Sequence, residues 1–368
     1  MTAPLAGLKV VELARILAGP WAGQVLADLG AEVTKVESPE GDDTRRWGPP
    51  FVANEDGSRD AAYFHAANRG KRSVVADFGS EQGRALVLDL VREADVLIEN
   101  FKLGGLARFG LDYASLHAIN PRLVYCSITG FGHDGPYAAR AGYDFIVQGM
   151  SGIMDLTGDP LGPPQKIGVA YADILTGLYA VIAIQAALHQ REATGKGQHI
   201  DMALLDVMTG TLANQAMNYL VSAQSPTRLG NAHPNIAPYE AFPVADGWLI
   251  VAVGNDSQFA RLATLLGLPE RPEWRTNPGR VEHRAALSPA VAERTRTWQR
   301  DALLAALEAE GIPAGPINTV GQALADPQIA ARGMVLDLGD GLEGLRTPIR
   351  FSDAELAPAR RSPKLGEG

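Results

Sequence analysis

The sequence predicts an α/β protein with a mostly parallel, doubly wound sheet and a second, smaller α+β domain. Short runs rich in β-branched residues alternate with helical patterns through the first 130 residues. Strands that alternate with helices at this spacing form parallel sheets covered by helices. A change of composition at Ser225 and Pro226 marks the start of the smaller domain.

The elements of the first part follow from hydrophobic periodicity and turn residues. The expected strands are at residues 8–14, 33–36, 73–76, 95–99 and 123–128. The expected helices are at residues 21–29, 81–92 and 112–119, and Gly30 stands at the end of the first. The polar segment 38–60 is too long for a simple connection and is interpreted as a binding loop.

The carboxyl ends of these strands are the expected place for a ligand, because parallel sheets bind ligands beyond that edge. Four segments follow strands there and are expected to form one neighbourhood: residues 15–19, 37–38, 100–102 and 129–135.

The second half of the chain begins with a long apolar helical pattern near residue 168, which ends at the turn T-G-K-G of residues 194–197. A second long helix is expected at residues 201–222. The smaller domain is expected to hold strands at 239–243 and 248–253 and helices at 257–266, 290–296 and 301–310. We therefore place a large domain at 1–200, a linking helix at 201–225 and a small domain at 226–330.

Composition narrows the class of protein. The 368 residues are 46% hydrophobic and 20% charged, and the formal net charge of −9 argues against a nucleic-acid partner. The single cysteine, Cys126, excludes an internal disulfide and is expected to be buried. We find no basic leader and no uninterrupted apolar run of membrane-spanning length. The expectation is a cytoplasmic protein without a membrane partner.

Asp173 is the residue that stands out, because it is a lone carboxylate in the apolar run G-V-A-Y-A-D-I-L-T-G that opens the long helix. Burial of an unpaired carboxylate is unfavourable and raises its pKa. The residue is therefore either the N-cap of the helix or a functional acid. Both interpretations are open from the pattern alone.

Several catalytic motifs are absent or incomplete. G-F-G-H-D-G at residues 130–135 matches the spacing of a dinucleotide-binding loop, but Pro136 and a further loop follow instead of a helix, so an NAD-dependent dehydrogenase is only a distant alternative. The sequence has neither a triphosphate-binding loop nor a G-x-S-x-G serine motif. Its seven histidines show no metal-binding spacing, so no metal site is expected.

Taken in order, several segments resemble the class III CoA-transferase family across nearly the whole chain. The segments are A-R-I-L-A-G-P-W-A at 14–22, L-A-D-L-G-A-E-V-T-K-V-E at 26–37, G-D-D-T-R at 41–45, N-R-G-K-R-S-V at 68–74, A-D-V-L-I-E-N-F at 94–101, G-F-G-H-D-G-P-Y at 130–137, A-D-I-L-T-G at 172–177 and T-G-K-G-Q at 194–198. The resemblance implies a Rossmann-like large domain completed by residues 331–368, a small domain and an interlocked homodimer.

The resemblance also implies roles for individual residues. Asp173 matches the nucleophilic aspartate of the family, and coenzyme A is implied as substrate and product, without a permanently bound cofactor. The implied contacts to CoA are Arg15, Ile16, Leu17, Ala18, Ala76, Asn100, Phe101, Lys102, Arg108, Tyr143 and Asp144. Ser38 and Gly79 stand where formyl-CoA transferase has basic residues, so Lys71 or Arg72 is expected to bind the CoA phosphates instead.

The same comparison separates two activities. Racemases of the family place a histidine before the position of Asp144, whereas this chain has Tyr143, whose phenol has an ordinary pKa near 10 and is a poor base at neutral pH. An α-methylacyl-CoA racemase is therefore the alternative, and a CoA-transferase is the main hypothesis. The implied reaction moves CoA from an acyl-CoA donor to a carboxylic acid through an anhydride and a thioester of Asp173.

The segment R-L-G-N-A-H-P-N-I-A-P-Y-E-A-F at 228–242 resembles the branch of the family that uses succinyl-CoA and dicarboxylates. The resemblance implies that this loop closes over the acyl group, with His233, Asn235 and Tyr239 as substrate-loop residues. Succinyl-CoA is accordingly the expected donor.

Overall fold

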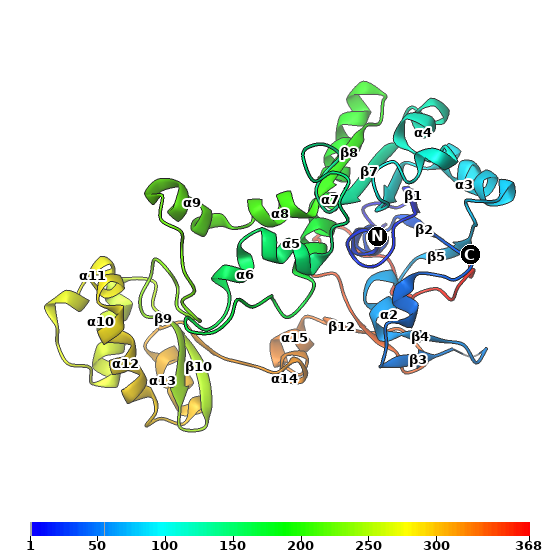
Figure 1. Ribbon diagram of the computed structural model, residues 1–368. Coiled ribbons are helices and arrows are strands. Elements are labelled where there is room, and N and C mark those ends of the chain that lie inside the picture. Colours follow the sequence, from blue (N-terminus) through cyan, green and yellow to red (C-terminus); the bar gives the residue numbers. More distant parts are fainter. Residues whose placement is uncertain (1, 55) are drawn as a thin grey trace. The chain divides into compact units, whose positions relative to one another are not determined.

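The computed structural model describes residues 2–54 and 56–368, and these form two compact units. The first unit contains residues up to 154, 166–224 and 327–368, and the second contains residues 155–165 and 225–326. Segment 155–165, which the sequence placed in the large domain, thus belongs with the second unit. We describe each unit by itself (Figure 1).

The first unit is built on a six-stranded parallel sheet in the order β5-β2-β1-β6-β7-β8. The strands are β1 Lys9–Glu12, β2 Glu32–Glu37, β5 Arg72–Val75, β6 Val96–Glu99, β7 Val124–Thr129 and β8 His199–Ala203. The helices of this unit are α1 Ala18–Asp28, α2 Ala62–Asn68, α3 Glu81–Glu93, α4 Tyr113–Ile119, α5 Asp144–Met150, α7 Tyr171–Thr194, α8 Leu204–Gly210, α9 Ala213–Ser222 and α15 Pro327–Ala331. A short helix, α6 Ile153–Leu156, lies at the boundary of the two units.

Alternate residues of the strands point to two separate cores, as the period of a β-strand requires. Val10, Ile98 and Cys126 pack with α1 and α7 on one face, whereas Val11 and Tyr125 pack with α3 and α4 on the other. Both faces are therefore covered by helices. The parallel α/β arrangement and the buried state of Cys126 are confirmed.

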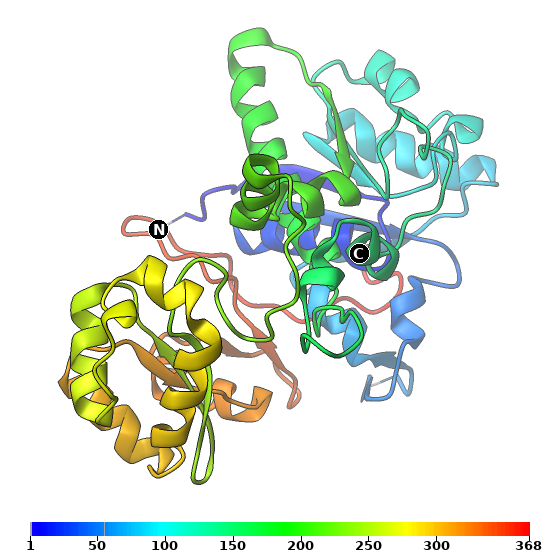
Figure 2. The same cartoon turned by 60° about the vertical axis from the view of Figure 1, so that its left-hand side comes forward.

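The sixth strand is the main difference from the prediction. Residues 199–203 form β8, which pairs with β7, and the expected helix at 201–222 is instead β8 followed by two short helices. Its sequence, H-I-D-M-A, runs into α8 without a turn residue, so helical periodicity concealed the strand. As a result, α7 is the crossover between two neighbouring parallel strands, and it lies beside both of them (Figures 1 and 2).

The polar segment 38–60 and the carboxyl terminus are also more ordered than the sequence indicates. A 3₁₀ turn at Asp43–Arg46 precedes the hairpin of β3 Phe51–Ala53 and β4 Arg59–Ala61, and β12 Val335–Asp337 pairs with β13 Glu343–Leu345. The last residues return to β5, where the Ser73 amide donates to the Glu367 carbonyl (3.1 Å) (Figure 1).

The second unit is an α+β structure around the antiparallel sheet β11-β10-β9. Its strands are β9 Tyr239–Val244, β10 Gly247–Ala252 and β11 Ala314–Pro316, and its helices are α10 Asp256–Leu266, α11 Asn277–Glu282, α12 Arg284–Thr295, α13 Arg300–Ala309 and α14 Val320–Leu324. Leu249 and Val251 are buried against the helices while Trp248 and Ile250 are exposed, so one face of the sheet carries the core.

Among the described residues, α7 alone has the length and hydropathy of a membrane span. A core helix of a folded domain passes the same test. Here Ala180, Val181, Ile184 and Ala187 bury one side of α7 in the core that it shares with α1 and the sheet.

Candidate active site

Asp173 is the third residue of α7, and it is not the helix cap. The N-cap position is Ala170, whose side chain makes no capping hydrogen bond. The free amide of Ala172 instead donates to Asp144 Oδ1 at 2.8 Å, so the cap is supplied by another helix, α5. The interpretation of Asp173 as N-cap is therefore wrong, and its carboxylate is left for another role.

Gln148 locks the start of α7 against α5. Its side chain is fully buried, its Nε2 donates to Asp144 Oδ2 (2.8 Å), and its Oε1 accepts from the Ile167 amide (2.9 Å). Both oxygens of Asp144 are thus engaged in positioning the backbone next to Asp173. Asp144 was predicted to contact CoA, and in the structure both of its carboxylate oxygens are used to hold the start of α7.

The electrostatic environment of Asp173 disfavours the ionised carboxylate. Burial, and then the negative charge of Asp144, raise the pKa of Asp173 to about 7. The group therefore titrates near neutrality. A carboxylate with that pKa is more basic than an ordinary aspartate and is a better nucleophile once ionised.

The helix α7 packs closely on α1 one turn beyond Asp173. A Cβ atom on Gly177 would lie 2.7 Å from the Ala18 carbonyl and 3.1 Å from Trp21 Cβ, so only glycine allows this approach. Asp173 and Gly177 are one helical turn apart and share a face of α7. The face of α7 that carries Asp173 thus packs, at Gly177, against Ala18 in the first turn of α1.

Tyr63 is a site residue that the sequence analysis missed. It lies on α2 with its ring edge-on to Trp47 (centroids 5.3 Å apart). Burial, and then the charges of Asp173, Asp144 and Asp42, raise the pKa of Tyr63 to about 12. The phenol is therefore a hydrogen-bond donor at neutral pH. Tyr63 lies a few residues before the segment N-R-G-K-R-S-V at 68–74. This proximity to a family-like segment was the signal that the sequence offered for Tyr63.

Asn100 holds the turn after β1 from the neighbouring strand end. Its Oδ1 accepts from the Arg15 amide (2.9 Å), and its Nδ2 donates to the Arg15 carbonyl (2.7 Å). The amide group is thus largely occupied by the backbone of Arg15. Arg15 itself is exposed, pairs with Asp43 (3.0 Å) and lies 5.8 Å from the centre of the Phe101 ring.

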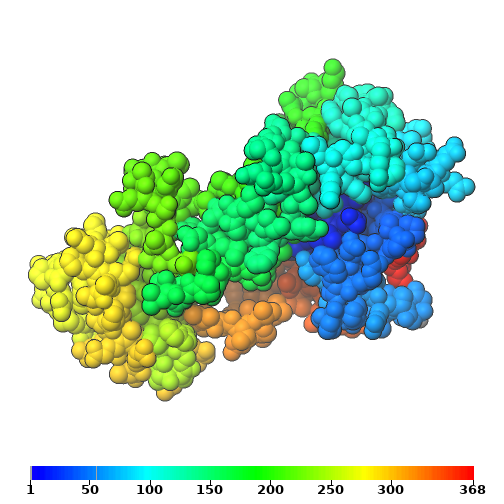
Figure 3. All heavy atoms as spheres, in the orientation of Figure 1, coloured from blue at the N-terminus to red at the C-terminus, as the bar shows by residue number. Residues whose placement is uncertain are grey.

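Aromatic rings link the remaining predicted contacts at the ends of β5 and β6. Phe78 lies 6.0 Å from both Phe101 and Phe109, and the Arg108 guanidinium stacks 4.4 Å from Phe109. Ala76 is buried in the same core. These contacts connect Arg15, Asn100, Phe101 and Arg108 at the carboxyl ends of the strands. In the view of Figure 3, the surface is recessed where the dark blue N-terminal segment lies between cyan and blue segments.

Lys71 is not available for a phosphate, which corrects the prediction. Its ammonium is buried and bonds to Glu12 Oε2 (2.8 Å), the Pro20 carbonyl (2.8 Å) and Asn68 Oδ1 (2.9 Å). Burial is the main reason that the pKa of Lys71 falls to about 8. Arg72 is exposed at the start of β5.

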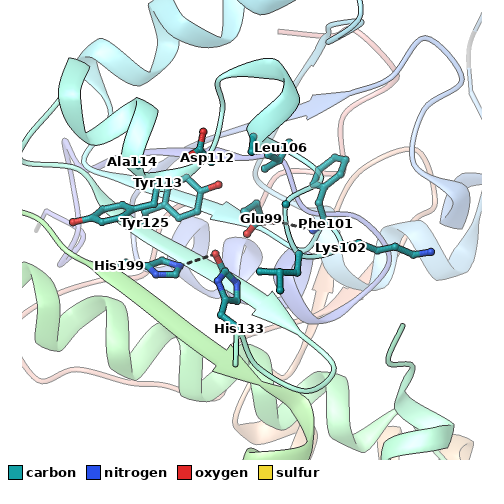
Figure 4. A pocket seen from close by; sticks show the side chains of 14 residues that line it. Glu99, Phe101, Lys102, Leu106, Asp112, Tyr113, Ala114, Tyr125, His133 and His199 are labelled. Atoms are coloured by element: carbon teal, nitrogen blue, oxygen red, sulfur yellow. Dashed lines mark hydrogen bonds between the residues drawn. The ribbon is translucent and has the colours of Figure 1, made fainter. Parts of the chain in front are cut away.

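Beside Phe101 and Lys102, a cavity of about 330 Å³ lies over one face of the sheet (Figure 4). It is lined by Glu99 at the end of β6, by Tyr125 and Ser127 of β7, and by His199 at the start of β8. The buried Glu99 accepts from the Phe101 amide (2.7 Å), and burial raises the pKa of Glu99 although its bond to Ser127 opposes this. Ser127 Oγ lies 2.9 Å from His199 Nε2, and the His199 ring stacks on Tyr113. Lys102 extends away from the two histidines. Glu99 thus fixes the backbone that presents Phe101.

The predicted substrate-loop residues all lie in the second unit. The His233 amide donates to the Tyr239 carbonyl (2.9 Å), the Asn235 amide donates to His233 Nδ1 (3.1 Å), and the His233 and Tyr239 rings are 5.3 Å apart. The loop is therefore internally braced. Tyr143, in the first unit, is the N-cap residue of α5 and is 63% exposed, which leaves its ring free for contacts.

Over residues 2–54 and 56–368, no group of three or more His, Cys, Asp or Glu side chains is placed to hold a metal ion. The acid, phenol and amide groups described above suit acyl chemistry at a carboxylate. Such chemistry needs a nucleophile, oxyanion donors and a binding surface for the substrate.

Comparison with known proteins agrees with this arrangement. Residues 5–368 match the family model of CoA-transferase family III. A succinate–glutarate CoA-transferase of Agrobacterium fabrum is 59% identical over 99% of this chain and 93% of its own length. A human succinyl-CoA:glutarate CoA-transferase is 41% identical over 99% of this chain and 84% of its own length. The crystal structure of a CAIB/BAIF family protein from Brucella suis is similar with a TM-score of 0.91 and 67% identity, and covers 100% of this chain and 97% of that chain. The chain belongs to CoA-transferase family III and is a CoA-transferase.

Proposed function

We propose that the protein moves CoA from succinyl-CoA to a dicarboxylic acid such as glutarate, with Asp173 as the nucleophile. The observation that carries the proposal is the position of Asp173 in the first turn of α7. There its carboxylate is not used as a cap, its pKa is raised to about 7, and Gly177 brings the helix against the start of α1. The names of the similar enzymes support the choice of acids.

In the proposed reaction, the Asp173 carboxylate attacks the carbonyl of the donor thioester. The C–S bond breaks, CoA leaves as a thiolate, and an acyl-aspartyl anhydride remains. The thiolate then attacks the aspartyl carbonyl, which releases the donor acid as a carboxylate and leaves an aspartyl-CoA thioester. The acceptor carboxylate reverses these two steps and departs as the new CoA ester. No net oxidation and no ATP are required.

Each tetrahedral intermediate carries an oxyanion that needs a hydrogen-bond donor. We assign one such donor to the Tyr63 hydroxyl. It stays protonated at neutral pH because burial and the charges of Asp173 and Asp144 raise its pKa to about 12. The CoA moiety is assigned to the edge formed by Arg15–Ala18, Ala76, Asn100–Lys102 and Arg108, with Arg72 as the phosphate ligand. Tyr143 is assigned to the CoA moiety as well, and the loop of His233, Asn235 and Tyr239 is assigned separately to the acyl group.

We further propose that the first unit is a Rossmann-like CoA-binding domain, the second unit a small α+β domain, and the active molecule an interlocked homodimer. Large apolar side chains exposed on α5, α7 and α9 support the dimer, because such exposure is typical of surfaces that another chain covers. They include Phe145, Ile146, Ile182, Leu220 and Val221. The absence of membrane and nucleic-acid partners and the cytoplasmic location stay predictions.

The experiment is incubation of the protein with succinyl-CoA and a panel of mono- and dicarboxylic acids, with new CoA esters identified by mass spectrometry. We expect glutaryl-CoA from the wild-type protein and none from Asp173→Ala, which should still bind CoA. Near-wild-type turnover of Asp173→Ala would exclude this nucleophile. Exchange of solvent deuterium into the α-position of a 2-methylacyl-CoA, without an acceptor acid, would favour the racemase alternative.

A further inference from the structure

The turn between β1 and α1 contains an unusual backbone conformation at Ile16. Its φ angle is +72°, in the left-handed region, which β-branched residues rarely adopt. Of the four non-glycine residues with positive φ in the described chain, it is the one that is β-branched. Such a conformation costs free energy and persists only where neighbouring groups impose it.

The Ile16 amide is held by the side chain of Asp42. The Ile16 amide donates to both carboxylate oxygens of Asp42, at 3.3 Å and 3.2 Å, and the Asp42 side chain is only 1% exposed. Ile16 and Asp42 are 26 residues apart, so this is a tertiary contact and not a local turn. It connects the loop after β2 to the turn after β1.

The other partners of the Asp42 carboxylate are hydrogen-bond donors as well. Thr44 donates to Oδ1 through its amide (3.0 Å) and its hydroxyl (2.8 Å), and the Lys35 ammonium lies 2.9 Å from Oδ2. Burial opposes ionisation, but the Lys35 charge and the Thr44 bonds hold the pKa of Asp42 below its usual value. Both oxygens must therefore accept, and an asparagine could offer only one acceptor.

Lys35 fastens the other side of the same turn. Its fully buried ammonium also donates to the Ala14 carbonyl (2.9 Å) and to Glu12 Oε1 (3.1 Å). Ala14 is the residue directly before Arg15, whose own amide and carbonyl are held by Asn100. The backbone from Ala14 to Ile16 is thus fixed at consecutive residues by three side chains, and none of the three lies on the turn.

We propose that Asp42 is a positioning residue for CoA binding, which acts by holding Ile16 in the left-handed conformation and so sets the direction of the Arg15–Ala18 backbone. Leu17 and Ala18 have buried side chains, so what this turn presents to a ligand is largely its backbone and the Arg15 guanidinium. The inference rests on the proposed function, because it takes this turn as part of the CoA site.

The test uses four variants in which the effect on backbone conformation is separated from the loss of a charge. Asp42→Asn should raise the Kd for CoA about 10-fold while kcat at saturating acyl-CoA changes less than 2-fold. Adding Ile16→Gly to Asp42→Asn should restore most of the affinity, because glycine adopts positive φ without help from Asp42. Ile16→Ala in the same background should not, since alanine keeps a Cβ atom. Ile16→Gly alone is the reference for the double variant, and adding Asp42→Asn to it should change the Kd for CoA by much less than 10-fold.

Asp42→Asn also leaves Lys35 with one buried partner fewer, so the folded state of every variant is checked by circular dichroism and thermal unfolding. If Asp42→Asn does not fold, Ile16→Pro provides the test with Asp42, Lys35 and Thr44 intact. Proline fixes φ near −65° and removes the amide donor, so this variant should lose CoA affinity at least 10-fold.

The outcomes separate this inference from the proposed function. Calorimetric titration of the wild-type protein with CoA comes first, and an absence of binding there would contradict the proposed function itself. If the wild type binds CoA, unchanged affinity in Ile16→Pro or equal rescue by glycine and alanine would overturn the role of Asp42. A structural role without positioning would lower the unfolding temperature and leave Kd the same in all the folded variants.

Discussion

Asp144 contacts the residue before Asp173 and also changes the charge state of Asp173. Its Oδ1 accepts the Ala172 amide at 2.8 Å, and its charge, after burial, is the second cause of the raised pKa of Asp173. One carboxylate therefore both sets the geometry of the helix start and tunes the nucleophile. Substitutions at Asp144 will alter both properties.

The first prediction concerns the pH dependence of the reaction. Asp173 attacks as a carboxylate, so kcat/KM should rise with pH through the pKa of about 7 and level off above it. Asp144→Asn removes the second cause of that shift, and the rising limb should move to lower pH. Steady-state rates between pH 5 and 9 measure this. Asp89→Asn, on the exposed side of α3, is the matched control and should leave the limb in place. A limb unmoved in Asp144→Asn would contradict the coupling.

The second prediction concerns stability. The folded-state pKa of Asp173 is raised from 3.8 to about 7, so the folded protein holds this proton more tightly than the unfolded chain does, and stability is lost as pH rises from 4 to 7. Asp173→Asn carries no charge at any pH. Its free energy of unfolding should exceed that of the wild type by about 2 kcal/mol at pH 8. This is less than the whole pKa shift of Asp173 corresponds to, because the Asp173 side chain is partly exposed. Near pH 4 the two proteins should be equal.

Urea unfolding at pH 4 and pH 8 makes this comparison, with Asp89→Asn again as the control. Equal stability of the wild type and Asp173→Asn at both pH values would show that ionisation of Asp173 does not destabilise the folded protein.

The third prediction concerns Tyr63. If its hydroxyl stabilises the oxyanions, Tyr63→Phe should lower kcat by about 10²-fold with a smaller change in the KM for acyl-CoA, the usual effect of losing one oxyanion donor. Tyr219→Phe, on the exposed face of α9, provides a control in which the same atom is removed elsewhere. A kcat in Tyr63→Phe within 3-fold of the wild type would remove Tyr63 from the mechanism.

The fourth prediction separates the two neighbouring cations Lys71 and Arg72. Lys71→Met removes a buried partner of Glu12 and should lower the free energy of unfolding by about 3 kcal/mol, with an unchanged KM for acyl-CoA. Arg72→Ala should raise that KM several-fold at unchanged stability, and more strongly at low ionic strength. A raised KM with unchanged stability in Lys71→Met, together with an unchanged KM in Arg72→Ala, would instead assign Lys71 to the phosphate site.

The sequence was sufficient for the features that depend on local periodicity or on a distinctive residue. Five strands of the large sheet, β1, β2, β5, β6 and β7, leave such a signal, and so do the burial of Cys126 and the unusual position of Asp173. Strand β8 left no such signal in the sequence. Its five residues run directly into a helix, so their hydrophobic pattern looks like the beginning of that helix. Its identity depends on pairing with β7, which lies more than 70 residues earlier.

Roles that depend on tertiary contacts were outside the reach of the sequence. Lys71 and Arg72 are adjacent and equally basic, yet only the fold decides that one is buried against Glu12 and the other faces solvent. The sequence also gave no sign that the amide group of Asn100, a predicted CoA contact, holds the backbone of Arg15. Tyr63 has no motif of its own, and its significance comes from three carboxylates on other segments.

The return of the carboxyl terminus to β5 affects how the chain folds during synthesis. The Gly70 amide donates to the Arg360 carbonyl, Arg45 Nη2 donates to the Pro363 carbonyl, and the Gly366 amide donates to Ser73 Oγ. The edge of the large sheet is therefore completed by residues that are synthesised after the whole of the second unit. The second unit, encoded between the two parts of the first, is released earlier, so it can complete its own core while the nascent first unit still lacks its final segment.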